Sequence, residues 1–305
     1  MGCDFGQARL PGARRAMTVM PEPVWRLDAL LGEGPVWLPE EQALRFVDIK
    51  RGLLHRFEPA SGACETLAVG GSPSFIVPAD DGSLLVGSVH GLHRLGADSL
   101  GEPLATIPQP AHNRTNDATV DAAGRLWFGT MDDSEEQPTG KIWCFHRGAL
   151  IEAGGAAVVT NGPAVCSGDR FLYRVDSGAR TIWRHPLEGP GLLGAGEVFV
   201  QLGEDEGFPD GIVVDAEDCL WVALWDGWGV RRYASDGTLL CHIAFPCARV
   251  TKLAFGGPDL RTAYVTTARV GLDEQSLAAQ PLAGSLFAFA APAAGRPLPA
   301  VAIHR

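Results

Sequence analysis

The sequence repeats one unit of strand, turn, strand, loop and strand six times. An aromatic residue or a leucine marks the second strand of each unit: Phe46, Leu85, Trp127, Tyr173, Trp221 and Tyr264. Successive markers are 39, 42, 46, 48 and 43 residues apart. Such a period is typical of a β-propeller, in which each small sheet buries its faces against its neighbours around a central axis. We therefore predict an all-β fold, a six-bladed β-propeller; a β-sandwich with as many strands would lack this period.

The repeat predicts a single domain over residues 21–305, preceded by a loose leader over residues 1–20. The leader has no apolar core of a secretory signal, and Met17 or Met20 could serve as an alternative start. Val24 to Leu30 alternates as a strand does, and we expect it to join the last blade and close the ring. The 38 glycines and 22 prolines are consistent with many short strands joined by turns.

The net charge and the cysteine content limit the possible binding partners and the cellular compartment. The formal net charge is −11, which is unfavourable for a nucleic-acid partner because phosphate binding requires a basic surface. The seven cysteines are odd in number and include no CxxC pair, which predicts reduced thiols and a cytoplasmic protein. No run of 18 apolar residues occurs, so we predict no membrane segment. The sequence gives no indication of the oligomeric state.

Polar residues begin the first strand of every repeat. In a propeller this strand is innermost, and its N-terminal end opens on the central channel. The residues eleven to thirteen positions before each marker are Glu33, Ser74, Asn116, Asn161, Asp210, and Thr251 or Lys252. Asn-Gly and Asp-Gly pairs are common in turns, so one instance would mean little. Six equivalent positions predict a polar ring at the channel, and we place the active site there.

Three of these positions have glycine and proline as neighbours in the sequence. These neighbours restrict the backbone conformation and thereby set the direction of the side chain. The three positions are Glu33 in GEGP, Asn161 in NGP and Asp210 in PDG. Two carboxylates that converge repel each other unless a cation lies between them. Two carboxylates and an amide oxygen form an all-oxygen site that suits a hard divalent cation. The ring has no Cys or His, which argues against a structural zinc site.

Five stretches of the sequence together form a specific pattern: LGEGPVW, RTNDATVDAAGRLWFGTM, TNGPAV, FPDGIVVD and TKLAFGGPDLRTAYVTTAR. With these stretches, the chain resembles the senescence marker protein, gluconolactonase and regucalcin family of six-bladed propellers, from about Trp25 to about Ala290. The chain is most similar to bacterial sugar lactonases of the xylonolactonase type in three motifs: NDATVD, the GTM that follows it, and the later WVALW.

The resemblance implies roles for individual residues. The metal ligands of the family fall on Glu33, Asn161 and Asp210, and its substrate contacts fall on Arg114 and Asn116. A family glutamate that touches the sugar has no clear match here. Its aligned position is near Ser134, followed by Glu135 and Glu136. The fourth repeat also departs from the family in CSGDRFLYRVDS, where we expect a changed turn in an intact blade.

The implied activity is hydrolysis of a sugar aldonolactone to the aldonic acid. One divalent ion, calcium, zinc, manganese or ferrous iron, would polarise the carbonyl and activate a water molecule. Asp210 is the candidate general base, Arg114 a donor to substrate oxygens, and Asn116 a partner for a sugar hydroxyl. We interpret Asp117 as a buried acceptor for backbone N–H groups of its own turn, and His112 as a solvated loop residue.

Two other functions remain open. The same ligands could hold calcium in a non-catalytic, regulatory propeller, or serve a hydrolase of other, larger esters. Arg114 and Asn116 favour a polyhydroxylated substrate, which a bare cation site does not require. No GxSxG motif indicates a serine hydrolase, and the GPGLLG spelling at 189–194 is expected in a loop. We expect the loops 132–139 and 271–283 to cover the site.

Overall fold

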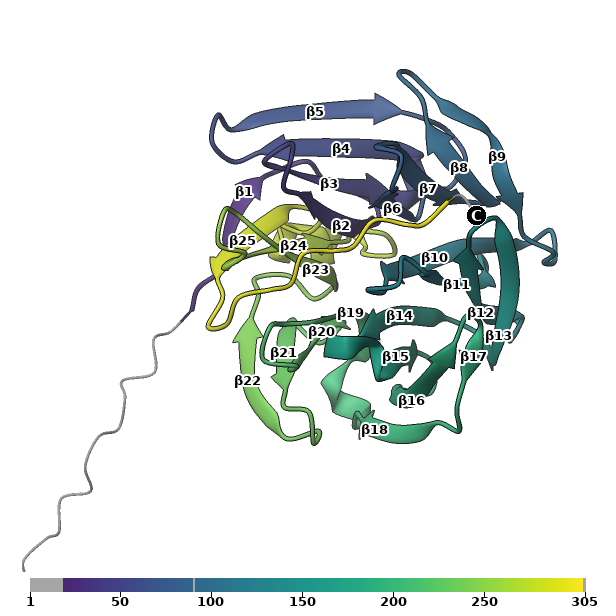
Figure 1. Ribbon diagram of the computed structural model, residues 1–305. Helices are drawn as coiled ribbons and strands as arrows, with labels where there is room; N and C mark the ends of the chain where they lie inside the picture. Colours follow the sequence, from purple (N-terminus) through teal and green to yellow (C-terminus); the bar gives the residue numbers. More distant parts are fainter. Residues whose placement is uncertain (1–18, 90, 304–305) are drawn as a thin grey trace, which may run out of the picture.

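The computed structural model describes residues 19–89 and 91–303, and these form six antiparallel sheets around a central axis (Figure 1). Blade 1 contains β2 (Gly32–Leu38), β3 (Ala43–Asp48), β4 (Leu53–Glu58) and β5 (Ala63–Ala68). Blade 2 contains β6 (Phe75–Pro78), β7 (Leu84–Ser88), β8 (Gly91–Leu95) and β9 (Leu100–Thr106). Blade 3 contains β10 (Asn113–Val120), β11 (Leu126–Asp132), β12 (Gly140–His146) and β13 (Ala149–Ala157).

The remaining blades follow the same order along the chain. Blade 4 contains β14 (Thr160–Val165), β15 (Phe171–Asp176), β16 (Thr181–Gly189) and β18 (Glu197–Gln201), with the short β17 (Leu192–Leu193) beside β16. Blade 5 contains β19 (Phe208–Val214), β20 (Leu220–Trp225), β21 (Gly229–Tyr233) and β22 (Leu239–Ala244). Blade 6 contains β23 (Val250–Gly256), β24 (Thr262–Thr267), β25 (Leu286–Ala290) and β1 (Glu22–Trp25). The predicted six-bladed propeller is confirmed.

Strand β1 closes the ring by pairing antiparallel with β25. A ring-closing strand from this part of the chain was predicted, but its predicted bounds, Val24 to Leu30, are wrong. The strand begins at Glu22 and ends at Trp25 because the chain then turns at Asp28, whose φ is 55°. Beyond that turn, the backbone N–H groups of Leu30 and Leu31 donate to the carboxylate of Asp48 in blade 1.

The aromatic markers of blades 3 and 5 are each held by a hydrogen bond from the indole to a buried aspartate. Trp127 and Trp221 are fully buried between blades. The indole N–H of Trp127 donates to Asp121 at 2.7 Å, and that of Trp221 donates to Asp215 at 2.9 Å. Each aspartate also accepts backbone N–H groups of the turn that joins the first two strands. A buried polar network of this kind ties the turn to the core, because the indole and the turn N–H groups share one aspartate as acceptor.

The fourth blade is intact although its first turn departs from the family pattern. A short 3-10 helix, η2 (Ser167–Asp169), replaces a regular turn between β14 and β15. The GPGLLG stretch was predicted to lie in a loop, but only part of it does: Gly189 ends β16, the chain turns at Pro190 and Gly191, and Leu192–Leu193 forms β17. The stretch begins no helix. Two further 3-10 helices, η1 (Ile49–Arg51) and η3 (Glu204–Glu206), lie before β4 and β19.

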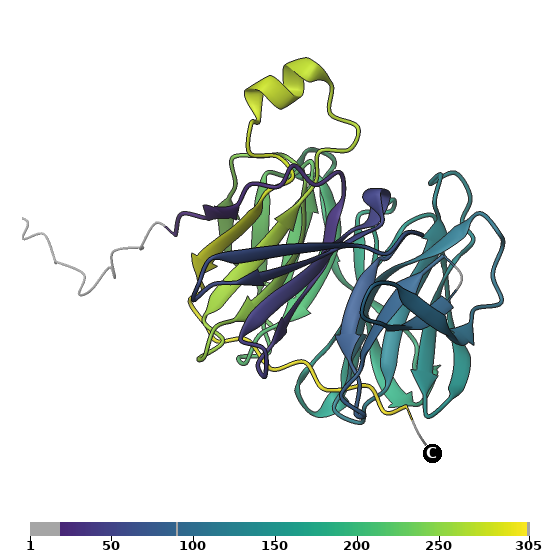
Figure 2. The same cartoon turned by 90° about the horizontal axis from the view of Figure 1, so that it is seen from above.

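The two faces of the propeller carry different segments (Figure 2). The stretch 271–283, predicted as a loop, contains the helix α1 (Glu274–Ala279), which stands above one face. The helix forms because the side chain of Asp273 caps it by accepting the Ser276 N–H. Among the described residues, no helix is long and apolar enough to span a membrane.

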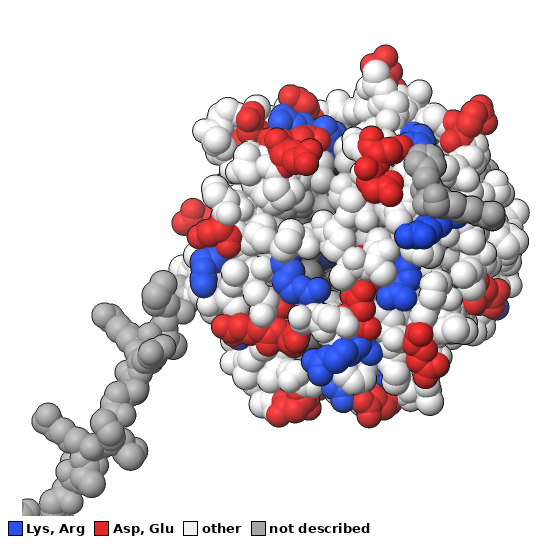
Figure 3. All heavy atoms as spheres, in the orientation of Figure 1, with Lys and Arg blue, Asp and Glu red and all other residues white. Residues whose placement is uncertain are grey.

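The C-terminal stretch 291–303 crosses the opposite face and bonds to five blades (Figures 1 and 2). Its backbone bonds to Leu260, Ala216, Gly124 and Pro78, and the Arg296 side chain donates to the Val165 carbonyl. On this face, acidic and basic side chains are interspersed (Figure 3). The six cysteines that the structure describes are free thiols, as predicted, and Cys3 lies outside the described residues.

Candidate active site

A cavity of about 520 Å³ opens on the face that carries α1, at the N-terminal ends of the innermost strands. All five predicted site residues line it: Glu33, Arg114, Asn116, Asn161 and Asp210. They come from β2, β10, β14 and β19, so four blades contribute. Its volume falls within the range of about 300–1,000 Å³ typical of small-molecule sites. The sequence therefore identified residues that the fold brings to one place.

A β-bulge at the start of each of these four strands aims the side chain. The pairing register shifts after Glu33 in β2, after Thr115 in β10, after Asn161 in β14 and after Pro209 in β19. A bulge leaves an extra residue unpaired and bends the strand, which redirects its side chain. Gly34 and Gly162 supply the left-handed backbone that two of the bulges need, with φ of 54° and 68°. The glycine and proline residues noted in the sequence are therefore the local cause of these bulges.

The expected ring of six positions is incomplete. Ser74, Thr251 and Lys252 do not line the cavity. Strand β6 begins only after Ser74, whose hydroxyl lies 2.6 Å from that of Thr115. Thr251 donates to the Gly32 carbonyl, and Lys252 turns below the cavity. The prediction of six equivalent positions is wrong for blades 2 and 6, because their first strands carry no equivalent side chain into the cavity.

A hydrogen-bond chain connects the site residues across three blades. Arg114 Nη1 donates to Asn116 Oδ1 at 2.6 Å, and Asn116 Nδ2 donates to Asn161 Oδ1 at 2.8 Å. Asn161 Nδ2 in turn donates to Ser177 Oγ at 3.0 Å, and Ser177 donates to the carbonyl of Pro209, the residue before Asp210. The chain fixes the Asn161 amide with its oxygen held on the Asn116 side. Buried networks of this kind are rigid when every member is satisfied.

Glu33 and Asp210 are buried carboxylates without an ion-pair partner among the described residues. They are 6% and 7% exposed. The cations around them are already committed: Lys50 and Arg114 to Asp133, and Lys252 to Asp117. Burial raises the pKa of Glu33 to about 8, and the nearby Asp117 carboxylate adds to this. Burial also raises the pKa of Asp210 well above its usual value, with further contributions from Glu33, Asp117 and Glu135.

This donor set fits a hard divalent cation. Two buried carboxylates with raised pKa values are strongly stabilised as anions by a positive charge, and the Asn161 oxygen keeps a lone pair beyond its bond from Asn116. Among the described residues, no group of three His, Cys, Asp or Glu side chains is arranged to hold a metal. The predicted set contains only two such residues and an amide, so an all-oxygen site with open positions is the arrangement it can offer.

Arg114 and Asn116 differ in what they can offer a substrate. Arg114 Nε donates to Asp133 at 2.6 Å, and Nη1 donates to Thr115 and Asn116. Within the part of the chain that the structure describes, Nη2 makes no hydrogen bond and is the donor left for a substrate. Both N–H groups of the Asn116 amide donate internally, to Asn161 and to the Thr160 carbonyl. Asn116 can therefore receive a substrate hydroxyl only through Oδ1.

Several residues at the rim escaped the sequence-based prediction. Lys50 bonds to Asp133 at 2.7 Å, and burial alone would raise the pKa of Asp133, but these bonds from Lys50 and Arg114 lower it overall. Ser134 and Glu135 line the cavity, close to the position where the family glutamate lacks a match. On the other side, Phe208 and Trp225 line the wall, each with an arginine stacked on its ring. The stretches 132–139 and 271–283 thus reach the cavity through Asp133 to Glu135 and Gly271.

Asp117 is placed as expected in one respect and not in another. Its Oδ1 accepts the Ala118 N–H at 2.8 Å, so the predicted role as a local backbone acceptor is present. The same oxygen also receives the ammonium of Lys252, from the far side of the channel. No sequence signal pointed to this partner.

Comparisons with known proteins identify the family of this chain. The model of the SMP-30/gluconolactonase/LRE-like region matches residues 31–269. The 6-deoxy-6-sulfogluconolactonase of Pseudomonas putida is 35% identical and the pentonolactonase of Haloferax volcanii 36% identical. The alignments cover 87% and 88% of this chain and 92% and 93% of those proteins. A crystal structure of regucalcin, a calcium-binding protein from Agrobacterium tumefaciens, superposes with a TM-score of 0.87 at 30% identity, covering 91% of this chain and 96% of that one. The chain therefore belongs to the SMP-30/gluconolactonase/LRE-like family.

Proposed function

We propose that this protein is a hydrolase that opens sugar aldonolactones to aldonic acids with the help of one divalent cation. One observation carries the proposal: two buried carboxylates, Glu33 and Asp210, share a cavity with Arg114 and lack an ion-pair partner among the described residues. The named activities of the two relatives, a pentonolactonase and a sulfogluconolactonase, support a sugar lactone as the substrate class.

Glu33, Asn161 and Asp210 would hold the cation. When bound, a divalent cation supplies Lewis-acid polarisation of an ester carbonyl and lowers the pKa of a water molecule. Calcium, zinc, manganese and ferrous iron are all compatible with these oxygen ligands, and availability in the cell contributes to the choice.

Asp210 would act as the general base. With the cation present its carboxylate is ionised and can take a proton from the attacking water. The water oxygen bonds to the lactone carbonyl carbon, the ring C–O bond breaks, and the leaving oxygen receives a proton to become the new hydroxyl. Arg114 Nη2 would donate to substrate oxygens, and Asn116 Oδ1 would accept from a sugar hydroxyl. Positioned proton transfer of this kind typically accelerates a reaction about 100- to 10,000-fold.

A non-catalytic calcium-binding role is the second candidate, and the structural similarity to a calcium-binding regucalcin favours it. The cavity lining distinguishes the two functions, because Arg114 Nη2 and the aromatic wall have no use in a bare cation site. A larger ester as substrate is the third alternative, and the same assay addresses it.

The test is a pH-drop assay with xylono-, arabinono-, galactono- and gluconolactone, run before and after chelation and again after each cation is restored. We expect turnover that chelation abolishes and one or more cations restore. Absence of turnover on every lactone with every cation would rule out the proposed activity. Retained cation binding without turnover would instead support the calcium-binding role, and turnover of simple aryl esters alone would favour a different ester substrate.

A further inference from the structure

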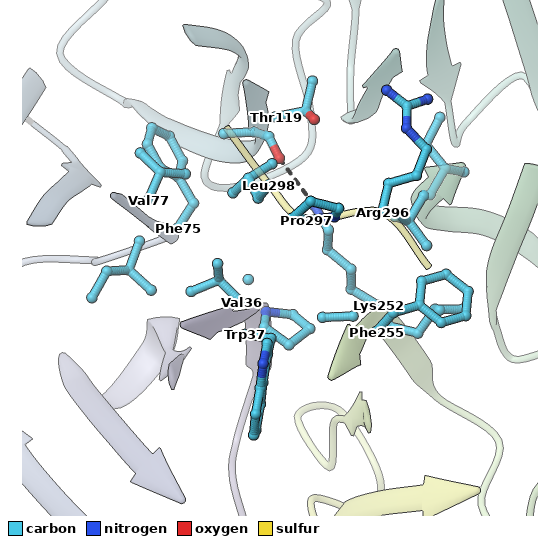
Figure 4. A pocket seen from close by; sticks show the side chains of 18 of the residues that line it. Val36, Trp37, Phe75, Val77, Thr119, Lys252, Phe255, Arg296, Pro297 and Leu298 are labelled. Atoms are coloured by element: carbon cyan, nitrogen blue, oxygen red, sulfur yellow. Dashed lines mark hydrogen bonds between the residues drawn. The ribbon is translucent and has the colours of Figure 1, made fainter. Parts of the chain in front are cut away.

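The ammonium of Lys252 crosses the central channel. Lys252 belongs to β23 in blade 6, and its Nζ donates to the carboxylate of Asp117 and, at 3.2 Å, to the carbonyl of Ala118. Both acceptors belong to β10 in blade 3, which lies opposite blade 6 in the ring. Figure 4 shows the Lys252 side chain running across the channel from its strand, beneath Pro297 of the C-terminal stretch. The pair therefore joins opposed blades through the axis of the propeller.

The pair lies between two cavities. Above it is the large cavity with Glu33 and Asp210, and below it a small one of about 80 Å³ lined by Lys252, Ala118 and the C-terminal Leu298. Lys252 is 7% exposed and Asp117 only 2% exposed. We call the Lys252–Asp117 pair the floor pair because it lies toward the small cavity; neither residue lines the large one.

Three buried carboxylates converge at this level of the channel, and Lys252 is the ammonium placed among them. The Asp117 carboxylate raises the pKa of both Glu33 and Asp210, Glu33 raises that of Asp210, and Lys252 lowers the pKa of all three. One buried charge without a counter-charge costs several kcal/mol, even after the surrounding structure relaxes. One divalent cation and one ammonium would together balance three ionised carboxylates. Without the cation, the Lys252 ammonium, bonded to Asp117, is the compensating charge at the centre of the channel.

We propose that Lys252 is a positioning residue that acts as a tethered counter-ion: it stabilises the acidic channel before the divalent cation binds and weakens the hold on that cation afterwards. The proposal rests on the proposed cation site at Glu33, Asn161 and Asp210. It follows from charge and position alone, since a fixed positive charge near the ligands stabilises the metal-free protein and repels the incoming cation. The floor pair would therefore stabilise the fold when no cation is bound. It would also weaken cation binding, so that the bound cation can dissociate.

The variant Lys252→Met tests this inference, because methionine retains most of the side-chain volume and removes the charge. The thermal midpoint of the variant is measured with a chelator and with saturating calcium or manganese, and the cation affinity is measured by competition with a chelating dye. We expect the midpoint to fall much more in the chelator than in the saturating cation. By linkage, the variant then binds the cation more tightly, by roughly tenfold for each 1.4 kcal/mol of selective destabilisation.

A purely structural role for Lys252 would lower both midpoints equally and leave the affinity unchanged, and this result would overturn the proposal. Lys252→Arg, which retains the charge, should behave more like the wild type than Lys252→Met does. The double variant Asp117→Asn/Lys252→Met removes both charges and should recover part of the metal-free stability, since replacing both members of a buried pair is often tolerated.

Two outcomes separate this proposal from the proposed function. If the wild-type protein gains no stability from any divalent cation, the cation site itself is wrong, and this inference falls with it. If the wild type binds a cation but Lys252→Met changes both midpoints alike, only the counter-ion role is wrong. Should Lys252→Met fail to fold in either condition, the double variant decides: a folded double variant supports the counter-ion role, and an unfolded one overturns it.

Discussion

The side-chain amide of Asn116 donates a hydrogen bond of 2.8 Å to Oδ1 of Asn161, across the boundary between blades 3 and 4. The bond joins a predicted substrate residue to a predicted metal ligand. It also fixes the oxygen of the Asn161 amide, whose nitrogen is directed to Ser177. The binding of cation and the binding of substrate are therefore expected to depend on one another at this contact.

Asn116→Ala should weaken cation binding although Asn116 is not itself a proposed ligand. Without Asn116, the Asn161 amide loses the donor that orients it, and loss of such supporting bonds typically costs about 10- to 100-fold in metal affinity. The affinity is measured by competition with a chelating dye, and the KM for the lactone in parallel. An unchanged affinity would show that the Asn116 bond does not orient a ligand.

Arg114→Ala should raise the KM for the lactone. Arg114 offers Nη2 to the substrate, and loss of a charged hydrogen bond of roughly 1.5–3 kcal/mol corresponds to about a 10- to 100-fold increase. Steady-state kinetics at saturating cation give the measurement. The exposed Arg170, varied to alanine, is the matched control, and a KM that stays at the wild-type value in Arg114→Ala would refute the substrate contact.

Asp210→Asn should abolish most turnover while the fold survives. The amide keeps the size of the side chain but accepts no proton at neutral pH, so we expect a loss of kcat of about 100-fold or more. The thermal midpoint in the absence of metal should stay close to that of the wild type or rise, because one of the buried carboxylates is neutralised. Asp205→Asn, at an exposed position in η3, controls for the substitution itself. Retention of most activity would remove Asp210 as the base.

Cation binding should release a proton at neutral pH. The pKa of Glu33 in the metal-free protein is raised to about 8, so its carboxyl is protonated at pH 7 and must ionise to bind a cation. The affinity should therefore rise with pH up to about this value and level off above it. Calorimetric titration in buffers with different ionisation enthalpies measures the proton count. Binding heats that do not depend on the buffer at pH 7 would contradict a protonated Glu33.

Stability should fall as the pH is lowered through the range between about 6.5 and about 4, partly because of His55. Burial lowers the pKa of His55 to about 4 from its usual value of 6.5, with smaller effects from Asp48 and Arg51. Between these values the unfolded chain binds a proton that the native protein does not, so unfolding becomes easier as pH decreases. The contribution of this residue is at most roughly 3 kcal/mol.

Urea unfolding at neutral pH and at a pH between those two values measures this effect. His55→Gln should lose part of the pH dependence, although the loss of its contact with Thr66 lowers stability at every pH. His112→Gln, at an exposed loop position, is the matched control. An unaltered pH dependence in His55→Gln would show that other groups cause the acid destabilisation.

Much of the candidate site could be predicted from the sequence because the orientation of its residues depends on their neighbours in the chain. The bulges that aim Glu33 and Asn161 into the cavity depend on Gly34 and Gly162, which stand next to them in the chain. Periodicity then places equivalent strand starts around one axis, which is why residues 177 positions apart, Glu33 and Asp210, could be assigned to one place. The ring-closing strand was predicted for the same reason, but its end at Trp25 depends on a turn at Asp28 that has no strong sequence signal.

The sequence by itself determined the number of blades, the innermost strands and the polar residues at their starts, because each repeat folds by its own alternation and turns. Only the tertiary structure decided which of those residues meet. Ser74 is held away from the cavity by a strand that starts late, and Lys252, assigned to the ring, bonds instead to Asp117 across the channel. Contacts between opposite blades join residues that are far apart in the chain. Such contacts depend on the length and charge of individual side chains, which the repeat pattern of the sequence does not indicate.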